Sequence, residues 1–248
     1  MVALYIFYRL FMKQFHLMLT ILSCSLFPVF TAANSVGSGA SGIQLNESVI
    51  VIETEYAEGT ATLTNKSASP VMLHSSLQVV AEDASEKVIV TPSVARVEPG
   101  ETQLVRFFLK DEYKNTLKQQ TLVRAIFQNI PPKKQNNVGL TIRHNVPLII
   151  HPSTLPKNNK PWQFLNFSQD VHGNIVVKND GDYVVRLSES LILQPRNGRA
   201  ELPQSYILPG KTLVATKNTS FNGKASSVTI QPANLYGYIS DSYTAELK

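Results

Sequence analysis

The sequence predicts an all-β protein built from two β-sandwich domains, and three observations support that class. Short runs of alternating apolar and polar residues dominate the chain, beginning with "SVIVIETEY" at residues 48–56. Turn-forming segments separate these runs about every 8–12 residues, the spacing of strands in a sandwich. The helical period is absent except weakly at residues 111–120. We therefore expect sheets throughout, with at most one short turn of helix.

Residues 1–33 have the composition of a secretory signal peptide. Arg9 and Lys13 precede an apolar run over residues 15–30, and small residues follow at positions 31–33. This is the order of charged region, apolar region and cleavage site in exported proteins. We expect cleavage near the end of this segment and export to the periplasm.

Two features of this segment leave alternatives open. Met12 begins "MKQFHLML", which resembles a natural start, so either Met1 or Met12 is the initiator. Cys24 follows "ILS" and could be acylated instead, although the apolar run continues past it. Cleavage would remove the chain's single cysteine, so no disulfide is expected. It would also remove two basic residues and no acidic one, so the formal charge of +5 would fall to +3. A charge this small does not favour a nucleic-acid partner.

Two domains are expected, at residues 34–153 and 157–248. The segment "STLPKNNKPW", residues 153–162, has two prolines and no period, so it reads as the connection between them. The turns "RVEPGE" and "ILPGKT" take similar places in the two halves, which is compatible with two copies of one architecture. In chain order, the expected strands lie within residues 48–56, 59–65, 70–80, 87–100, 102–110, 121–130, 136–152, 161–170, 173–180, 182–193, 200–210, 212–218, 226–234 and 236–247.

The expected strand at residues 136–152 is long and has one apolar face. Its even positions are aliphatic from Val138 to Ile150, except for His144, while the odd positions up to Asn145 are small or polar. Pro147 cannot donate a ladder hydrogen bond, which places the strand at a sheet edge. Apolar edge strands promote aggregation, so an apolar strand at an edge indicates that the edge has a function.

Catalytic chemistry is not indicated. The sequence has no G-x-S-x-G, P-loop, H-E-x-x-H or C-x-x-C motif. His144 and His151 are seven residues apart, on opposite faces of one strand, which does not suit a shared metal ion. Glu53 and Glu55 share a strand face, and solvated surface carboxylates explain them better than an acid–base pair. We expect no enzyme activity, no cofactor and no metal, and we expect binding by surfaces.

Several segments then match one family in the correct order. These are "TPSVARVEPGETQLVRFF", "NIPPK", "NVGLTIRHNVPLIIHP", "VVKNDGDYVVRLSE", "YILPGKT" and "YISDSY". Together they resemble the PapD-like family of periplasmic pilus-assembly chaperones, over essentially the whole chain after residue 33. The resemblance implies two immunoglobulin-like sandwich domains joined at an angle. The short connection "IPPKKQNNVG" resembles the branch of the family that serves rigid, rod-like pili.

The resemblance also explains the apolar strand. Members of this family lend an edge strand to incomplete pilin subunits, cap them and deliver them to an outer-membrane usher. Main-chain pairing and alternate side chains would provide the contact. Carried onto this sequence, the donor residues are Val138, Leu140 and Ile142. The alternative from the period alone is that these side chains face their own domain's core. A self-capping dimer is a further expectation.

The sequence departs from the family at two basic positions. The family holds the pilin's C-terminal carboxylate with an arginine in its first strand and a lysine before its "YRP" motif. Here these positions align with Val49 and Pro147, and neither can bind a carboxylate. Arg143 lies on the same strand face as Pro147 and is the expected substitute, with Arg124 and Arg106 as alternatives. The alternative for Arg143 is that it merely keeps an exposed face soluble.

A second departure concerns the contact between the domains. The family uses an ionic network of arginine, aspartate and glutamate, which align here with His151, Asp241 and Gln120. We expect a His151–Asp241 pair to connect the domains with a dependence on pH. The competing interpretation of the whole chain is an exported structural or adhesive surface protein with two immunoglobulin-like domains.

Overall fold

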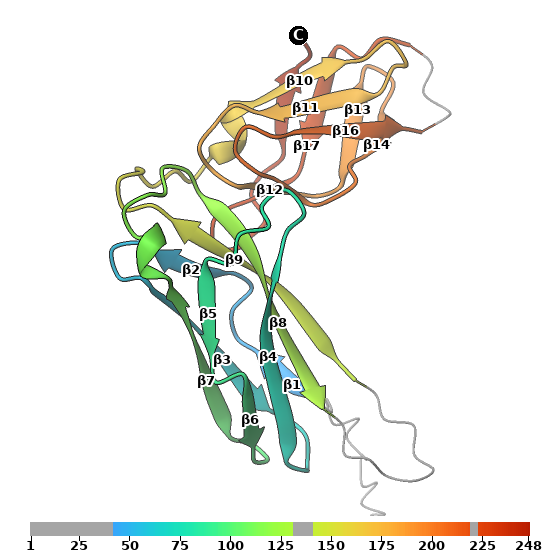
Figure 1. The fold of residues 1–248 in the computed structure, drawn as a ribbon. Coiled ribbons are helices and arrows are strands. Elements are labelled where there is room, and N and C mark those ends of the chain that lie inside the picture. The colour runs from blue at the N-terminus through green and yellow to red at the C-terminus, as the bar shows by residue number, and fades with distance from the viewer. Residues whose placement is uncertain (1–41, 131–140, 219–222) are drawn as a thin grey trace, which may run out of the picture. The chain divides into compact units, whose positions relative to one another are not determined.

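The regular secondary structure of the described residues is almost entirely β-strand, so the predicted all-β class is confirmed (Figure 1). The computed structural model describes residues 42–130, 141–218 and 223–248. Within these ranges the helical segments are two short 3-10 turns, η1 (Asp111–Tyr113) and η2 (Pro161–Phe164). None of the helices described is long and apolar enough to span a membrane. The expected signal peptide, Val138 and Leu140 lie outside the described residues.

The first half of the chain forms one sheet of nine strands, paired in the order β5-β7-β3-β2-β9-β8-β4-β6, with β1 beside β3. The strands are β1 (Ile43–Leu45), β2 (Ile50–Glu53), β3 (Glu58–Asn65), β4 (Val71–Val79), β5 (Val88–Thr91), β6 (Val94–Val97), β7 (Thr102–Leu109), β8 (Thr121–Ile130) and β9 (Arg143–His151). Strand β2 pairs with β3 on one side and with β9 on the other, so it joins the two layers that enclose the core.

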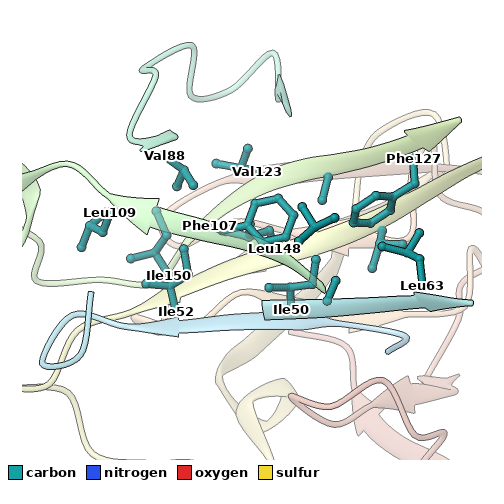
Figure 2. Close-up of a cluster of buried hydrophobic side chains, with 14 of the residues drawn as sticks. Ile50, Ile52, Leu63, Val88, Phe107, Leu109, Val123, Phe127, Leu148 and Ile150 are labelled. Atoms are coloured by element: carbon teal, nitrogen blue, oxygen red, sulfur yellow. The ribbon is translucent and has the colours of Figure 1, made fainter. Parts of the chain in front are cut away.

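The core of this half is built from alternate residues of strands in both layers (Figure 2). Ile50 and Ile52 of β2 are buried, as are Leu148 and Ile150 of β9. The rings of Phe107 on β7 and Phe127 on β8 meet edge to face, with centroids 6.1 Å apart. A fully buried aliphatic or aromatic side chain contributes about 1.5–3 kcal/mol, so a core of this size can hold a domain together without disulfides.

Strand β9 is shorter and less exposed at its edges than the sequence suggests. Its antiparallel pairing with β8 runs from Arg143 to Ile150. On its other side, β2 pairs with it in parallel only from Leu148 to His151. The expected edge position is therefore wrong for the second half of β9, which lies between two strands. Pro147 immediately precedes the pairing with β2, so its missing N–H breaks no bond to that strand.

The second half of the chain forms two sheets. A seven-stranded sheet has the order β10-β11-β16-β14-β13-β17-β19, and a three-stranded sheet has the order β15-β12-β18. The strands are β10 (Leu165–Gln169), β11 (Ile175–Asn179), β12 (Val185–Leu187), β13 (Ser190–Gln194), β14 (Gly198–Glu201), β15 (Tyr206–Ile207), β16 (Thr212–Lys217), β17 (Ser227–Ile230), β18 (Pro232–Ala233) and β19 (Tyr243–Glu246). A second buried cluster, including Phe167 and Val185, lies between them.

A third, smaller cluster joins the two halves. Val49, Leu122 and Ile149 of the first half pack with Val184 and Leu208 of the second half. Ile149 has the opposite parity along β9 to Leu148 and Ile150, so it projects from the outer face of the sheet. The apolar run at the end of β9 therefore serves the domain core with one face and this junction with the other.

Candidate functional site

The described part of the expected donor segment continues the apolar face of β9. Ile142 directly precedes the strand and has the same parity as the core residues Leu148 and Ile150. Its backbone N–H donates a hydrogen bond to Oδ1 of Asn129, 2.9 Å away. Its side chain is half-buried, and a Cβ added at Gly42 would lie 2.9 Å from its Cδ1 atom. Ile142 thus extends the core stripe of β9 by one position toward the expected donor residues.

The first part of β9 pairs with a strand on one side only among the described residues. Residues 143–147 face β8, while the pairing with β2 begins at Leu148. A side-chain contact links this part of β9 to β1, because Nε2 of His144 lies 2.7 Å from the carbonyl oxygen of Ile43. β1 itself pairs with β3 rather than with β9. This stretch of β9 therefore has one backbone edge on which another strand can pair.

The outer face beside this edge is polar. Arg143 is exposed, and its Nη2 donates to Oε1 of Gln78 at 3.1 Å. Arg124 on β8 lies directly opposite Pro147 and donates through Nε to Oδ1 of Asn145 at 2.6 Å. Both guanidiniums thus make hydrogen bonds to neutral groups. The expected substitute cation and its first alternative are both on this face.

Arg106, the second alternative, lies elsewhere and has a carboxylate partner. It extends from β7 toward Glu58 on β3, with Nε–Oε1 and Nη2–Oε2 distances of 2.6 and 2.8 Å. The hydrogen bonds from Arg106 lower the pKa of Glu58 below its ordinary value. A guanidinium already held by a two-point bond to a carboxylate is not available for a second one.

Sequence reasoning missed one arginine near this face. Arg186 on β12 lies between the buried residues Val185 and Leu187. Its Nη1 atom is buried and has no hydrogen-bond partner in the described part of the chain. Burial lowers the pKa of Arg186, and the charge of Arg124 lowers it further. A charged residue inside the run "YVVRL" was the available sequence signal, but its direction depends on the packing of the second half.

The residues expected at the junction of the two halves are only partly brought together. Nε2 of Gln120 lies 2.9 Å from Nδ1 of His151, and both side chains are buried. Oε1 of Gln120 accepts a hydrogen bond from the backbone N–H of Val184 at 2.8 Å. The backbone N–H of Gln120 donates to the carbonyl of Asp182. Gln120 therefore connects strand β9 to the second half of the chain.

Asp241 takes no part in this junction, so the expected His151–Asp241 pair is not present. Asp241 is exposed in the loop before β19 and lines a surface hollow of about 650 Å³ with Trp162 and Tyr236. Among the described residues, the charged groups that act on His151 are Glu53 and Lys157. The described residues also contain no cluster of histidine, cysteine or carboxylate side chains that could hold a metal ion.

Comparison with known proteins identifies the family. Residues 42–156 match the family described as "Pili and flagellar-assembly chaperone, PapD N-terminal domain". The uncharacterized fimbrial chaperone YhcA of Escherichia coli K12 is 30% identical over 225 residues, which cover 90% of this chain and 97% of that protein. The chain belongs to the PapD-like pilus-assembly chaperones. Members of this family are assembly chaperones and not enzymes.

Solved chaperone structures share the fold of this family member. The YadV chaperone superposes with a TM-score of 0.69 at 20% identity, covering 83% of this chain and 99% of its own. The SafB chaperone in complex with the SafA pilin of Salmonella enterica gives 0.69 at 15% identity, covering 83% and 96%. The CsuC–CsuE chaperone–tip subunit complex of Acinetobacter baumannii gives 0.60 at 17%, covering 83% and 98%. The predicted two immunoglobulin-like domains are confirmed.

This pilus chaperone also has a distinctive local structure at Val49 and Pro147. Val49 is 8% exposed and packs in the junction cluster. Pro147 is buried between Arg124 on β8 and the start of the pairing with β2. Both positions are thus occupied by apolar side chains that contribute to packing. Any cation near them must come from a different strand.

Proposed function

We propose that this chain is a periplasmic chaperone that binds and caps pilin subunits by donating the strand that leads into β9. The donor side chains are those of Val138, Leu140 and Ile142. The bound subunit is then passed to an outer-membrane usher. The observation that carries the proposal is that, among the residues that the structure describes, residues 143–147 pair with β8 alone, while their apolar face continues toward Ile142.

The energetics favour such a contact. A strand added along the free side of β9 would satisfy its backbone N–H and C=O groups, and alternate side chains would enter the open groove of the subunit. Three fully buried aliphatic side chains contribute roughly 1.5–3 kcal/mol each before ordering costs are subtracted. Ile142, the one proposed donor residue that the structure describes, is half-buried.

Two solved chaperones of the same fold support a pilus subunit as the partner. SafB and CsuC were each solved in complex with a pilus subunit. The competing function, a structural or adhesive surface protein with two immunoglobulin-like domains, does not explain an apolar stripe beside a free strand edge. The expected segment at residues 1–33 supplies the route to the periplasm.

Co-production with candidate pilin subunits tests the proposal. We expect a soluble one-to-one complex with at least one subunit, and its loss in the double variant Leu140→Glu, Ile142→Glu. A matched control is Ile89→Glu, because Ile89 is an exposed aliphatic residue on a different strand, β5. The control should retain the complex. Capture that is unchanged in the double variant would contradict strand donation.

A further inference from the structure

We infer that one end of the second half of the chain, which we call the basic tip, binds the surface of an anionic lipid bilayer. Basic side chains would contact the headgroups, and the exposed side chain of Val171 would enter between them. The donor segment lies in the first half, so this contact goes beyond pilin binding and does not depend on it. The described segments of the basic tip are residues 170–174, 195–199, 217–218 and 223–226.

Strand pairing and loop contacts bring these segments together. Figure 1 shows β10 and β16 running toward the same end of the second half. A Cβ added at Gly173 would lie 2.6 Å from Nζ of Lys217, so the turn between β10 and β11 lies beside the end of β16. Lys217 in turn pairs with Ala200 of β14. Nε2 of Gln169 donates to the carbonyl oxygen of Gly223 at 3.2 Å. The segments therefore form one continuous surface.

Val171 is the most exposed large apolar side chain in the described part of the chain, at 96%. The turn that carries it is held by its own hydrogen bonds, because Oδ1 of Asp170 accepts the N–H groups of His172 and Asn174 at 2.9 and 2.8 Å. Gly173 provides the positive φ of +82° that the turn needs. A preordered turn loses little conformational entropy on binding. A single exposed aliphatic residue is common, so Val171 indicates a partner only together with its surroundings.

These surroundings are positively charged. The acidic and basic side chains in the described segments of the tip are Asp170, Arg196, Arg199, Lys217 and Lys224. Arg199, Lys217 and Lys224 form no ion pair with any residue that the structure describes. The carboxylate of Asp170 accepts hydrogen bonds within its own turn, and the carboxylates of Glu201 and Glu246 lie on adjoining strands, opposite Thr216 and Ser227. The tip thus has an excess of cations around an apolar side chain.

This combination suits a bilayer better than a soluble anion. The cations come from separate turns, so they match a surface with many headgroups rather than a single phosphate. Each Lys or Arg near an anionic membrane strengthens binding about 5-fold, the equivalent of about 1 kcal/mol. An apolar side chain among them adds contact with the boundary between headgroups and acyl chains. A soluble polyanion would attract the same cations but would leave Val171 in water.

Flotation with lipid vesicles tests the inference without any pilin. The mature chain is mixed with vesicles of phosphatidylcholine, or of equal parts phosphatidylcholine and phosphatidylglycerol. We expect it to float with the mixed vesicles only, and less at higher salt, because salt screens the attraction. The triple variant Arg199→Gln, Lys217→Gln, Lys224→Gln should bind roughly 100-fold more weakly. A wild-type chain that does not float with the anionic vesicles would refute the inference and leave strand donation standing.

A matched triple variant separates the tip from net charge. Lys66, Lys118 and Lys211 are exposed and lie outside the tip, so changing all three to Gln removes the same charge. This control should bind the anionic vesicles within a few-fold of the wild type. Equal losses in the two triple variants would show that overall charge directs binding, and would overturn the assignment to the tip.

Val171→Trp distinguishes a bilayer from a soluble polyanion. Tryptophan favours the membrane interface, so this variant should bind the anionic vesicles more tightly, and its fluorescence should shift to the blue. The wild-type emission should stay unchanged, because the chain's single tryptophan, Trp162, is 5% exposed. Dextran sulfate is the comparison probe and should cause no such shift. Vesicle binding without the shift, or with the same shift in dextran sulfate, would overturn the bilayer as the partner.

Discussion

Nε2 of Gln120 lies 2.9 Å from Nδ1 of His151 in a buried contact beside the junction of the two halves. The same amide accepts the backbone N–H of Val184 through its oxygen. Each end of the amide is thus used, one toward β9 and the other toward the second half. This contact stands where the family's ionic network was expected, and it contains no ion pair.

Replacing Gln120 by Met should destabilise the protein. The substitution leaves the buried N–H of Val184 and the Nδ1 atom of His151 without partners, at a cost of about 2–4 kcal/mol in unfolding free energy. Chemical denaturation measures the difference. Gln119→Met is the matched control, because the exposed Gln119 donates to Asp182 at 2.7 Å and water can replace that bond. Equal losses in both variants would contradict the role of Gln120.

His151 should make the protein less stable in mild acid. Burial lowers the pKa of His151, and a hydrogen bond with the backbone of Leu155 and the charge of Glu53 only partly oppose this. Below about pH 6.5 the unfolded chain therefore binds a proton that the folded chain resists. Stability should fall as the pH drops through this range, by at most about 1.4 kcal/mol per pH unit.

The variant His151→Gln should lose that dependence, because a glutamine can accept the bond from Gln120 without titrating. Unfolding curves at pH 7.5 and pH 5.5 would measure it. His172→Gln, in an exposed turn, should behave like the wild type. A wild-type chain that is equally stable at both values would refute the prediction.

Asp83→Asn should destabilise the first domain, because it removes the anionic partner of a buried lysine. Nζ of Lys87 lies 2.6 and 2.7 Å from the two carboxylate oxygens of Asp83, and the lysine side chain is 6% exposed. Removing the anion leaves a buried ammonium, which costs about 2–4 kcal/mol. Asp111→Asn is the control, because Asp111 pairs with Lys114 while 93% exposed and such pairs contribute little. Asp83→Asn should melt at a clearly lower temperature than Asp111→Asn. Equal melting temperatures in the two variants would contradict the prediction.

Most of the strands and their buried faces could be predicted from the sequence, because a period of two shows which side chains share a face of a strand. The period does not show which strands are neighbours in a sheet. The sequence predicts an edge strand at the apolar run of residues 146–150, whereas β2 covers one side of it and the junction cluster buries Ile149. A continuous apolar run is what a strand buried on both faces requires.

The candidate site shows the same limit. The Gln120–His151 contact involves residues that the family resemblance places together, since Gln120 directly precedes β8 and His151 ends β9, the strand that pairs with β8. Asp241 was placed wrongly because its loop is held by local bonds, in which Oδ1 of Asn234 accepts the N–H groups of Tyr236 and Tyr238. Arg186 was missed because its environment depends on residues far away in the sequence, which no local pattern can report.

Gly237 provides a last prediction, which concerns the same corner as Arg186. Its φ is +88°, and an added Cβ would meet Cγ2 of Val49 at 2.9 Å and Nη1 of Arg186 at 3.2 Å. Gly100 has a similar φ of +79°, but an added Cβ there would have nothing within 4 Å. Both Gly→Ala changes incur the backbone strain of about 1 kcal/mol, and only Gly237→Ala adds a steric conflict.

We therefore expect Gly237→Ala to lower the unfolding free energy by about 1–2 kcal/mol more than Gly100→Ala, because the side chains it meets are packed. The displaced guanidinium should also move the Nε–Hε NMR signal of Arg186, which Gly100→Ala should leave in place. Denaturation and NMR of the two variants measure both effects. If the two alanines cost the same and neither moves that signal, the close packing of Arg186 against this turn would be disproved.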